Sequence, residues 1–558
     1  MTYPNKLRAV DLYSGVGGWS LGLKMAGIEV VQSFELSQNA NRTNALNNGH
    51  ETTQTNIREI NFSNLPSNID IVVGSPPCTQ FSYSNRGGNG NIKDGIKDVI
   101  KFLSIVRYIK PKFWAMENVP RFQNIIENEL SKNGMLSDFM EMNINSYIFN
   151  MESFGLPQRR KRCIVGNFNF DLLKTYENNF LVSLGDVVSA LSADIVYDPL
   201  YDIRTSKDKL TLHCKEPFLD AEEVRINSAR KMHHVIYNSM AFPDSLCRTA
   251  RTVTATCTRV GRESIVIADP DNPTEFRRLT LRERASLQGF PITFQFLGTS
   301  FAQNLKMIGN ALPPPIAFYI GCAMREQNIN LLPCLREAGK VFKKPNCVAD
   351  NTPPESPKRR YPPTRNFRFA IPSLHLKSGV RFELRNHTEK SSVNWRIEFV
   401  YGNPKDIKSV QLGDSILNWF SGNSKAYSNP EIRKNLEKIR ARLSGLDLKN
   451  MQNVWSHSGP GLTRPFMFLD ILDEMATEFK SLIEKYACAT SEIEDFLLST
   501  CFEGQKNLVG NAKLLRNSNT VLSGILLGTI ANQVIAKSVG IRKLETKNTE
   551  QIIPLKVV

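Results

Sequence analysis

Over residues 7–168, short apolar segments alternate with segments whose apolar residues recur at helical spacing. The predicted strands are LRAVDLYSG (7–15), EVVQSFE (29–35), IDIVVGSPP (69–77), FWAMENV (113–119) and RCIVGNF (162–168), and the predicted helices are GGWSLGLKMAG (17–27) and DVIKFLSIVRYIKP (98–111). Strands separated by helices imply βαβ units. We therefore expect an α/β fold with a parallel sheet, helices on both of its faces, and a ligand crevice at the carboxyl ends of the strands.

The rest of the chain divides by composition. Residues 190–265 are irregular, polar and basic, and residues 266–335 return to the style of residues 1–189. Residues 336–365 are rich in Pro, Lys and Arg, which is typical of a linker. Residues 366–558 show segments that alternate at period two, followed by helical segments, and this order predicts a second domain of the α+β class.

The composition narrows the classes of protein. The chain has no evident run of about 18 apolar residues and no secretion signal at its start, so we expect a soluble cytoplasmic protein with no membrane partner. The 10 cysteines form no CxxC pair, which predicts reduced thiols and no metal site. A formal net charge of +16 favours a polyanionic partner such as nucleic acid.

A Gly-rich turn joins the first predicted strand to the first helix. Gly15, Gly17 and Gly18 lie in this turn, where glycine lets a ligand approach the backbone and the helix N-terminus favours negative charge. The next strand ends at Glu35, an acidic residue suited to ribose hydroxyls. The pattern indicates a nucleoside cofactor, although a tight structural turn is an alternative, and the lack of a GxxxxGK[ST] motif disfavours ATP.

The stretch GSPPCTQFS places Cys78 just past the end of a predicted central strand. The preceding Pro76 and Pro77 stiffen the loop. On its own, an isolated cysteine is more often a small buried hydrophobe than a nucleophile. A nucleophilic thiol needs a cationic neighbour or a lowered pKa, and the later stretch QRRKR offers cations.

Two further stretches carry charge to the same predicted edge of the sheet. Glu117 ends the strand in FWAMENV and is either a loop anchor or an acid/base partner. Arg160 and Arg162, in FGLPQRRKRCIVG, share a face of the next strand and suit phosphate or carbonyl groups. A basic run is usually a solvated face, but this one lies next to the other two stretches.

Taken together, these motifs resemble the DNA (cytosine-5)-methyltransferases of bacterial restriction-modification systems. The matching stretches, in the family's order, are DLYSGVGG, FE (34–35), PPCTQFS, MENV, GLPQRRKR, RRLTLRERASLQGFP and QNLKMIGNALPPPIA, and they span residues 7 to about 325. The resemblance implies a Rossmann-like methyltransferase core (1–189 and 266–335) that uses S-adenosylmethionine, a target-recognition region (190–265) and duplex DNA as the partner.

The resemblance also assigns roles. Cys78 is similar to the nucleophile that attacks carbon 6 of cytosine, and Glu117 to the residue that hydrogen-bonds or protonates the ring at N3. Arg162 resembles the arginine that holds the base and the sulfur, with Arg160 supporting the loop. Carbon 5 then takes the methyl group, and loss of its proton releases the thiolate. The target base must be flipped out of the duplex.

The cofactor site that the resemblance implies has both matches and departures. The matching positions are Tyr13, Gly15, Gly17, Gly18, Glu35, Ile57, Pro77 and Asn310. Asn56 stands where the family often has Asp, and its amide oxygen is expected to accept the same bond from adenine. Leu36 replaces a frequent aromatic residue, so apolar contact is kept without stacking, and Thr79 replaces a frequent Gln at a variable position.

Arg259 and Arg262, in the basic stretch RTARTVTATCTRVGR, are candidates for contacts to base edges, although exposed basic loops are common. Residues 366–558 match no family that we recognise, which leaves a fused nuclease, an accessory DNA-binding or protein-contact module, or a structural extension. The ExK triplet formed by Glu545 and Lys547 is the best nuclease candidate, but such triplets are frequent by chance. We favour the accessory module.

The sequence leaves three candidate functions. The leading one is a sequence-specific DNA cytosine-5 methyltransferase, acting as a monomer on DNA and paired with a cognate restriction endonuclease. A tRNA cytosine-5 methyltransferase is the alternative of the same architecture, and the sizeable variable region argues against it. A silent binding protein is the third, and the presence of Cys78, Glu117 and Arg162 together argues against that function.

Overall fold

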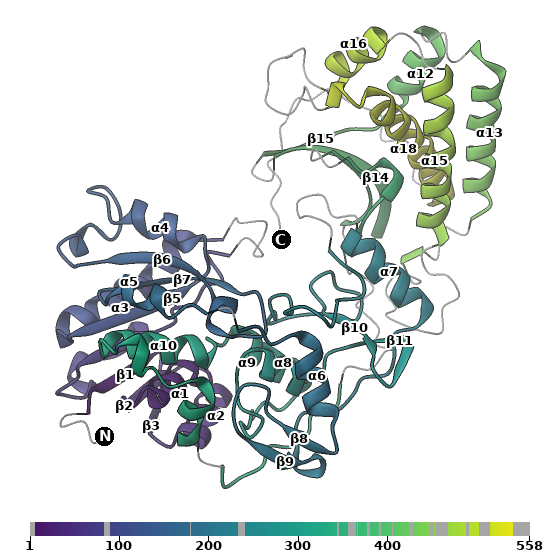
Figure 1. Cartoon of the computed structure of the whole chain (residues 1–558). Coiled ribbons are helices and arrows are strands. Elements are labelled where there is room, and N and C mark those ends of the chain that lie inside the picture. Colours follow the sequence, from purple (N-terminus) through teal and green to yellow (C-terminus); the bar gives the residue numbers. More distant parts are fainter. Residues whose placement is uncertain are drawn as a thin grey trace. The chain divides into compact units, whose positions relative to one another are not determined.

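The computed structural model divides into two compact units (Figure 1). Unit 1 comprises residues 1–219 and 242–355, and unit 2 comprises residues 220–241 and 356–556. The structure describes residues 6–82, 90–178, 180–232, 240–342, 345–354, 364, 366–376, 380–389, 392–403, 406–423, 428–446, 451–452, 467–486, 490–501 and 514–539. The ExK triplet at Glu545 and Lys547 lies outside these residues.

Unit 1 is built on a seven-stranded sheet. Its strands, in spatial order, are β3 (Glu51–Gln54), β2 (Glu29–Glu35), β1 (Arg8–Leu12), β4 (Ile71–Gly74), β5 (Phe113–Asn118), β7 (Lys161–Gly166) and β6 (Asn145–Asn150). The helices of this half are α1 (Gly18–Met25), α2 (Gln38–Asn48), α3 (Ile92–Ile109), α4 (Phe122–Glu129) and α5 (Phe170–Thr175). The α/β class expected from the sequence is confirmed.

The sheet has a separate hydrophobic core on each face. Along β4, Ile71 and Val73 join the core that contains α1 and α10 (Pro314–Met324), whereas Val72 joins the core that contains α3. Successive side chains of a strand point to opposite faces, so a strand buried on both sides reads as a continuous apolar run. The run Ile71–Val72–Val73 is such a run.

The sheet is not wholly parallel, which differs from the sequence expectation. β5 pairs with β7 antiparallel, and β6 pairs with β7 antiparallel. Strand β6 was not predicted from the sequence. The segment between β6 and β7 is too short for a helical crossover, and antiparallel pairing needs none. The reversal brings the start of β7 to the edge where β5 ends.

The second half of unit 1 packs on this sheet. Its elements are α6 (Leu184–Ser192), the β8–β9 pair (Ile195–Tyr197, Arg204–Ser206), the β10–β11 hairpin (Val266–Asp269, Asn272–Arg278), α8 (Leu281–Leu287), α9 (Phe301–Asn310), α10 and α11 (Leu335–Ala338). Helix α8 starts with a capping box in which Thr280 and Glu283 bind each other's backbone N–H. Reciprocal bonds of this kind satisfy two N–H groups of the first turn.

The linker is shorter than predicted. Residues 339–354 belong to unit 1, where Phe342 packs edge-on against Tyr201 with the ring centroids 4.8 Å apart. The Asn351 side chain accepts from the backbone N–H of Leu212 at 2.6 Å, and the Ala349 backbone N–H donates to Gln295. These apolar and polar contacts hold a segment that its Pro and Lys content alone would leave unattached.

Unit 2 has a four-stranded antiparallel sheet in the order β12 (Arg368–Ala370), β13 (Arg381–Glu389), β14 (Ser392–Asn403) and β15 (Asp406–Val410). Its helices are α7 (Ala221–Met232), α12 (Asp414–Asn423), α13 (Pro430–Ser444), α15 (Met467–Tyr486), α16 (Thr490–Cys501) and α18 (Ser518–Val539). Helix α7 comes from the region predicted as target recognition, so that region is shared between the two units.

Helix α18 is the core helix of unit 2. The segment Ser518–Lys537 is long and apolar enough to cross a membrane, with a mean hydropathy of 1.3, contrary to the expectation that the chain has no such run. However, 78% of its most apolar window is buried, which is typical of a core helix. Two glycines of α18 lie against the sheet, where a side chain at Gly524 would meet the Phe382 ring and one at Gly528 would meet Ile397.

Candidate active site

Cys78 lies four residues beyond β4, in a loop anchored to neighbouring elements. The Asn118 side chain, at the end of β5, donates to the Pro76 carbonyl at 3.1 Å, and the Trp19 indole donates to Ser75 Oγ at 3.0 Å. The Phe81 backbone N–H donates to the Cys78 carbonyl at 2.9 Å. Sequence reasoning missed the anchoring roles of Asn118 and Trp19.

Glu117 and Arg162 form an ion pair at the same edge of the sheet. Arg162 Nε lies 2.9 Å from Glu117 Oε1, and only 15% and 9% of the two side chains are exposed. The antiparallel register places Asn118 opposite Cys163, so the end of β5 and the start of β7 lie side by side. The structure thus brings together the carboxylate and the arginine that the sequence singled out.

The Cys78 thiol is part-buried and electrostatically coupled to this pair. Burial raises its pKa, and the negative charge of Glu117 raises it further, while Arg162 and Arg160 act in the opposite direction. The net pKa is raised, so the cations do not convert the thiol to a thiolate in the free protein. The lowered thiol pKa that nucleophilic attack calls for is therefore absent at rest.

Arg160 is a buried anchor. It is 1% exposed, and its guanidinium donates to the backbone carbonyls of Val253 at 3.2 Å, Gly309 at 3.1 Å and Ala311 at 3.2 Å. Burial lowers its pKa, with a smaller effect from Arg162. The side chain therefore ties the chain just before β7 to two distant stretches of unit 1 and positions the start of β7, which carries Arg162.

The Gly-rich turn is held by Glu35. One carboxylate oxygen of Glu35 accepts from the Gly15 backbone N–H at 2.9 Å, and the other accepts from the Ser37 N–H at 2.7 Å. Gly15 and Gly17 have left-handed backbone, with φ of 54° and 89°. A side chain at Gly15 would meet no atom within 4 Å, so open space lies beside this turn.

Two observations test whether this turn fits a nucleoside cofactor. The side-chain oxygen of Ser14, in the turn, is buried with no hydrogen-bond partner among the described residues. The space next to Gly15 is of the kind that a ligand occupies. Both fit a polar ligand placed against the turn. Gly18 instead packs against the protein, because a side chain there would lie 2.0 Å from the Leu312 carbonyl oxygen.

The remaining predicted cofactor residues lie at different depths. Ile57 is buried, at 3% exposure, while Pro77 and Asn310 are exposed, Asn310 as the last residue of α9. The Asn56 amide oxygen accepts from the Arg58 N–H at 3.2 Å and its amide nitrogen donates to Glu59. Asn56 therefore caps the short helix η1 (Ile57–Glu59), and one lone pair of its oxygen is already used.

A charged network that the sequence did not reveal joins η1, α3 and the Gly-rich segment. Arg58 binds Asp98 through Nε at 2.9 Å and Nη2 at 2.7 Å, and Asp94 through Nη1 at 3.1 Å. The Tyr13 hydroxyl donates to Asp98 Oδ1 at 3.2 Å. Burial and Asp98 raise the pKa of Tyr13, which keeps its hydroxyl protonated as a donor.

The two arginines proposed for base contacts are not exposed. Arg259 is 4% exposed, pairs with Glu216 at 3.3 Å, and donates to the carbonyls of Pro217 and Phe218. Arg262 is 8% exposed. Arg259 is held inside unit 1 by these bonds, so the prediction that it reads base edges does not agree with its position.

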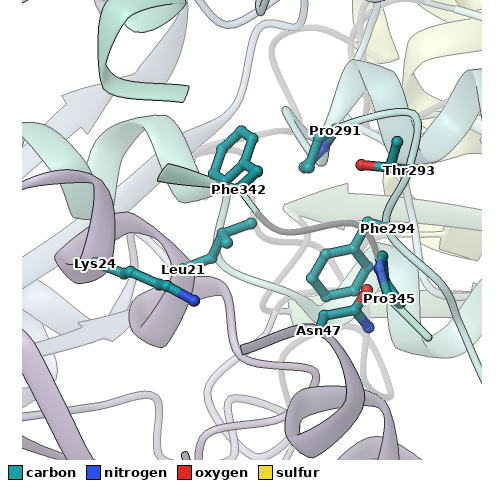
Figure 2. Close-up of a pocket in the computed structure, with 8 residues that line it drawn as sticks. All are labelled: Leu21, Lys24, Asn47, Pro291, Thr293, Phe294, Phe342 and Pro345. Carbon is teal, nitrogen blue, oxygen red and sulfur yellow. The ribbon is translucent and has the colours of Figure 1, made fainter. Parts of the chain in front are cut away.

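A small pocket lies elsewhere in unit 1 (Figure 2). It is lined by Leu21, Lys24, Asn47, Pro291, Thr293, Phe294, Phe342 and Pro345. None of the predicted catalytic or cofactor residues lines it, so it is not the site described above.

Comparison with known proteins decides the family. The family model described as C-5 cytosine-specific DNA methylase matches residues 7–326, more than half of the chain. The chain belongs to this family. The methylase is therefore an α/β enzyme that transfers a methyl group to carbon 5 of cytosine in DNA, and the family implies S-adenosylmethionine as the methyl donor. The resemblance found in the sequence is confirmed.

Several known proteins are similar to the methylase. Type II methyltransferase M.FnuDI of Fusobacterium nucleatum is 28% identical over 57% of this chain and 94% of its own. Type II methyltransferase M1.HphI of Haemophilus parahaemolyticus is 27% identical over 59% of this chain and 90% of its own. Among solved structures, S. pombe Dnmt2 methyltransferase is 17% identical over 57% of this chain and 99% of its own, with a TM-score of 0.40.

Proposed function

We propose that the methylase is the modification enzyme of a restriction-modification system, and that it methylates a flipped cytosine in duplex DNA through a covalent bond to Cys78. The buried pair of Glu117 and Arg162, electrostatically coupled to the Cys78 thiol, is the observation that carries the proposal. The similarity to proteins named type II methyltransferases supports the restriction-modification context.

Each residue of the site has its own role in the methyl transfer. As the sulfur of Cys78 bonds to carbon 6 of cytosine, the thiol proton passes to the Glu117 carboxylate, and Glu117 donates it to N3 so that the ring accepts the electron pair. Arg162 holds Glu117 and stabilises negative charge that develops on sulfur and base. After carbon 5 is methylated, loss of its proton breaks the bond to sulfur and restores the aromatic ring. Arg160 positions the loop through its three carbonyl bonds.

The Gly-rich turn between β1 and α1 would hold the cofactor. S-adenosylmethionine, when bound, supplies an electrophilic methyl group for carbon 5. Tyr13, Gly15, Gly17 and Glu35 would hold it, with Asn56, Ile57, Pro77 and Asn310 as further candidates and Gly18 setting the turn against Leu312. Because Glu35 already accepts two backbone N–H groups, its remaining lone pairs are those available to ribose hydroxyls.

The raised pKa of Cys78 bears on whether the thiol loses its proton before or after DNA binds. A thiol that stays protonated in the free enzyme does not react with stray electrophiles. A base that enters the Glu117 and Arg162 contacts would change the charges that act on the thiol. We infer that deprotonation of Cys78 follows binding of DNA.

Transfer of tritiated methyl groups from S-adenosylmethionine to DNA and to tRNA tests the proposal. Wild type is expected to label DNA and not tRNA, and Cys78→Ala to label neither. Label that persists in Cys78→Ala contradicts the covalent mechanism, and label on tRNA alone contradicts the DNA assignment. Bisulfite sequencing of DNA from a host that expresses the methylase then gives the target sequence.

A separate set of experiments tests the oligomeric state of the methylase and its place in a restriction-modification system. We propose that the methylase acts as a monomer in the cytoplasm and protects host DNA from a cognate restriction endonuclease. Methylated plasmid is expected to resist an endonuclease that recognises the bisulfite-defined sequence, and light scattering of the complex with a short duplex is expected to give one protein chain per duplex. A complex with two chains contradicts the monomer.

A further inference from the structure

Unit 2 is built partly from the recognition segment. The chain leaves unit 1 after Leu219, forms α7, and returns at Phe242, so that unit 2 is connected at three points and not by one linker. Within unit 2, Arg225 of α7 pairs with Asp470 of α15, and the Arg230 guanidinium lies 5.1 Å from the centroid of the Phe369 ring. A domain attached only as a tail would need neither contact.

The sheet of unit 2 has one apolar and one charged face. Phe382, Ile397 and Phe399 are buried on the face that packs against α18. Residues that alternate with them point to the other face, because successive side chains of a strand point in opposite directions. In Figure 1 the helices α13, α15 and α18 lie on one side of this sheet. The other face carries arginines.

Three arginines lie in register across three strands. Arg368 of β12 pairs with Arg385 of β13, which pairs in turn with Arg396 of β14. We call these three residues the arginine row. Their side chains are 48%, 27% and 57% exposed. Like charges directly opposite one another destabilise a sheet, so a row of this kind calls for a compensating partner.

Two carboxylates next to the row, on the same face of the sheet, compensate its charge only in part. Glu383 pairs with Arg368 and with the buried Arg381, and Glu398 pairs with Arg385 and Arg396. Two carboxylates thus face four guanidinium groups. The carboxylates also fix the orientation of the arginines, while Arg368 and Arg396 at the ends of the row keep about half of their side chains exposed.

We propose that unit 2 is a second DNA-binding element of the methylase, and that the arginine row contacts the phosphate backbone of duplex DNA. Neighbouring strands lie about 4.8 Å apart, so the row spans roughly 10 Å, a length over which a duplex carries about six phosphate charges. Antiparallel strands are among the elements that dock on duplex DNA. The enzyme already takes DNA as its substrate, and α7 joins unit 2 to the recognition segment.

The basic helix α13 is the competing surface in the same unit. Its Lys438 and Arg442 are paired with Glu478 and Glu474 of α15. Arg433 and Lys434 are exposed on the same helix and form no row across strands. They carry the same charge as two arginines of the row and therefore provide a matched control.

Fluorescence anisotropy with a 30-bp duplex of mixed sequence tests the proposal on the full-length chain. The double variant Arg368→Gln/Arg396→Gln is expected to bind about fivefold to tenfold more weakly at low salt, and the slope of log affinity against log salt should fall by about 1 to 2. The double variant Arg368→Lys/Arg396→Lys should retain most of the affinity. The control Arg433→Gln/Lys434→Gln should stay within about twofold of wild type. Thermal melting of all variants confirms that unit 2 is folded.

Several results would overturn the assignment. Binding by Arg368→Gln/Arg396→Gln within about twofold of wild type contradicts it, and so does an equal loss in the α13 control, which would indicate general charge attraction. Stronger competition by an RNA duplex of equal length would assign the row to RNA instead. Methyl transfer by wild type is measured in parallel, so a failure of the proposed function is seen separately from a failure of this binding site.

Discussion

Glu117 and Arg162 meet from strands that run in opposite directions. Arg162 Nε lies 2.9 Å from Glu117 Oε1, although the chain passes through β6 between them. Asn118 is opposite Cys163 in the register of β5 and β7, so Glu117 near the end of β5 lies close to Arg162 near the start of β7. Removal of either partner leaves a buried charge without compensation, which is costly.

The first prediction concerns this pair. Glu117→Gln keeps the shape of the side chain but removes its charge and its capacity to protonate N3. We expect the rate of methyl transfer to fall by about 10² or more, since general acid–base groups contribute on this scale. Single-turnover methyl transfer to plasmid DNA measures this rate. Glu127→Gln, at an exposed position of α4, is the control, and an equal loss there would contradict the role of Glu117.

The second prediction concerns the pH dependence of Cys78. Burial and the charge of Glu117 raise the pKa of the thiol, so the thiolate fraction stays low at neutral pH and rises only as the pH increases through the raised pKa. Alkylation of Cys78 by iodoacetamide, followed by mass spectrometry from about pH 6 to about pH 10, should therefore climb into the alkaline range.

In Glu117→Gln the like charge is gone, so the alkylation curve of Cys78 should move to lower pH. A curve that does not move, or that moves to higher pH, would contradict the coupling between the two groups. The exposed Cys347 reports on the reagent in the same samples.

The third prediction concerns the network of Tyr13, Arg58 and Asp98. Asp98→Asn removes the charge that Arg58 binds through two nitrogens and weakens the acceptor of the Tyr13 hydroxyl. Because these contacts fix η1 relative to the Gly-rich segment, we expect the KM for S-adenosylmethionine to rise about tenfold with little change in kcat. Calorimetric binding should show the same loss. Lys93→Gln, at an exposed position of α3, is the control, and a loss confined to kcat would contradict a role in cofactor binding.

Much of the site could be read from the sequence because its parts follow strand ends. Glu117 and Glu35 lie at the ends of apolar strands and Cys78 follows one by four residues, and the ends of neighbouring strands meet. The reversal of β7 could not be read, because local patterns do not encode strand direction. The start of the linker was predicted too early in the chain, because Pro and Lys content does not reveal tertiary contacts such as that between Phe342 and Tyr201.

The roles of the arginines also could not be predicted from the local sequence. Arg160, Arg162 and Arg259 look alike in a basic sequence, yet the first binds three carbonyls, the second a carboxylate at the site, and the third Glu216 inside unit 1. What separates them is burial and partner, and both depend on residues far away in the chain. The membership of α7 in unit 2 was hidden for the same reason.

The fourth prediction separates two glycines of the same turn. At Gly18 the backbone has no positive φ, but an added side chain would lie 2.0 Å from the Leu312 carbonyl oxygen. The backbone around Leu312 would have to shift, so Gly18→Ala should lower the free energy of unfolding by about 2 kcal/mol. At Gly15 an added side chain meets open space, and the φ of 54° costs about 1 kcal/mol.

Gly15→Ala should therefore remain more stable than Gly18→Ala while losing more affinity for S-adenosylmethionine, because its side chain would occupy the space assigned to the cofactor. Urea unfolding gives the stabilities, and calorimetry on the folded variants gives the affinities. If Gly15→Ala binds the cofactor as tightly as wild type, the space beside Gly15 is not the cofactor site. If Gly18→Ala is as stable as wild type, the close approach to Leu312 relaxes at no cost and Gly18 is free for a role in binding.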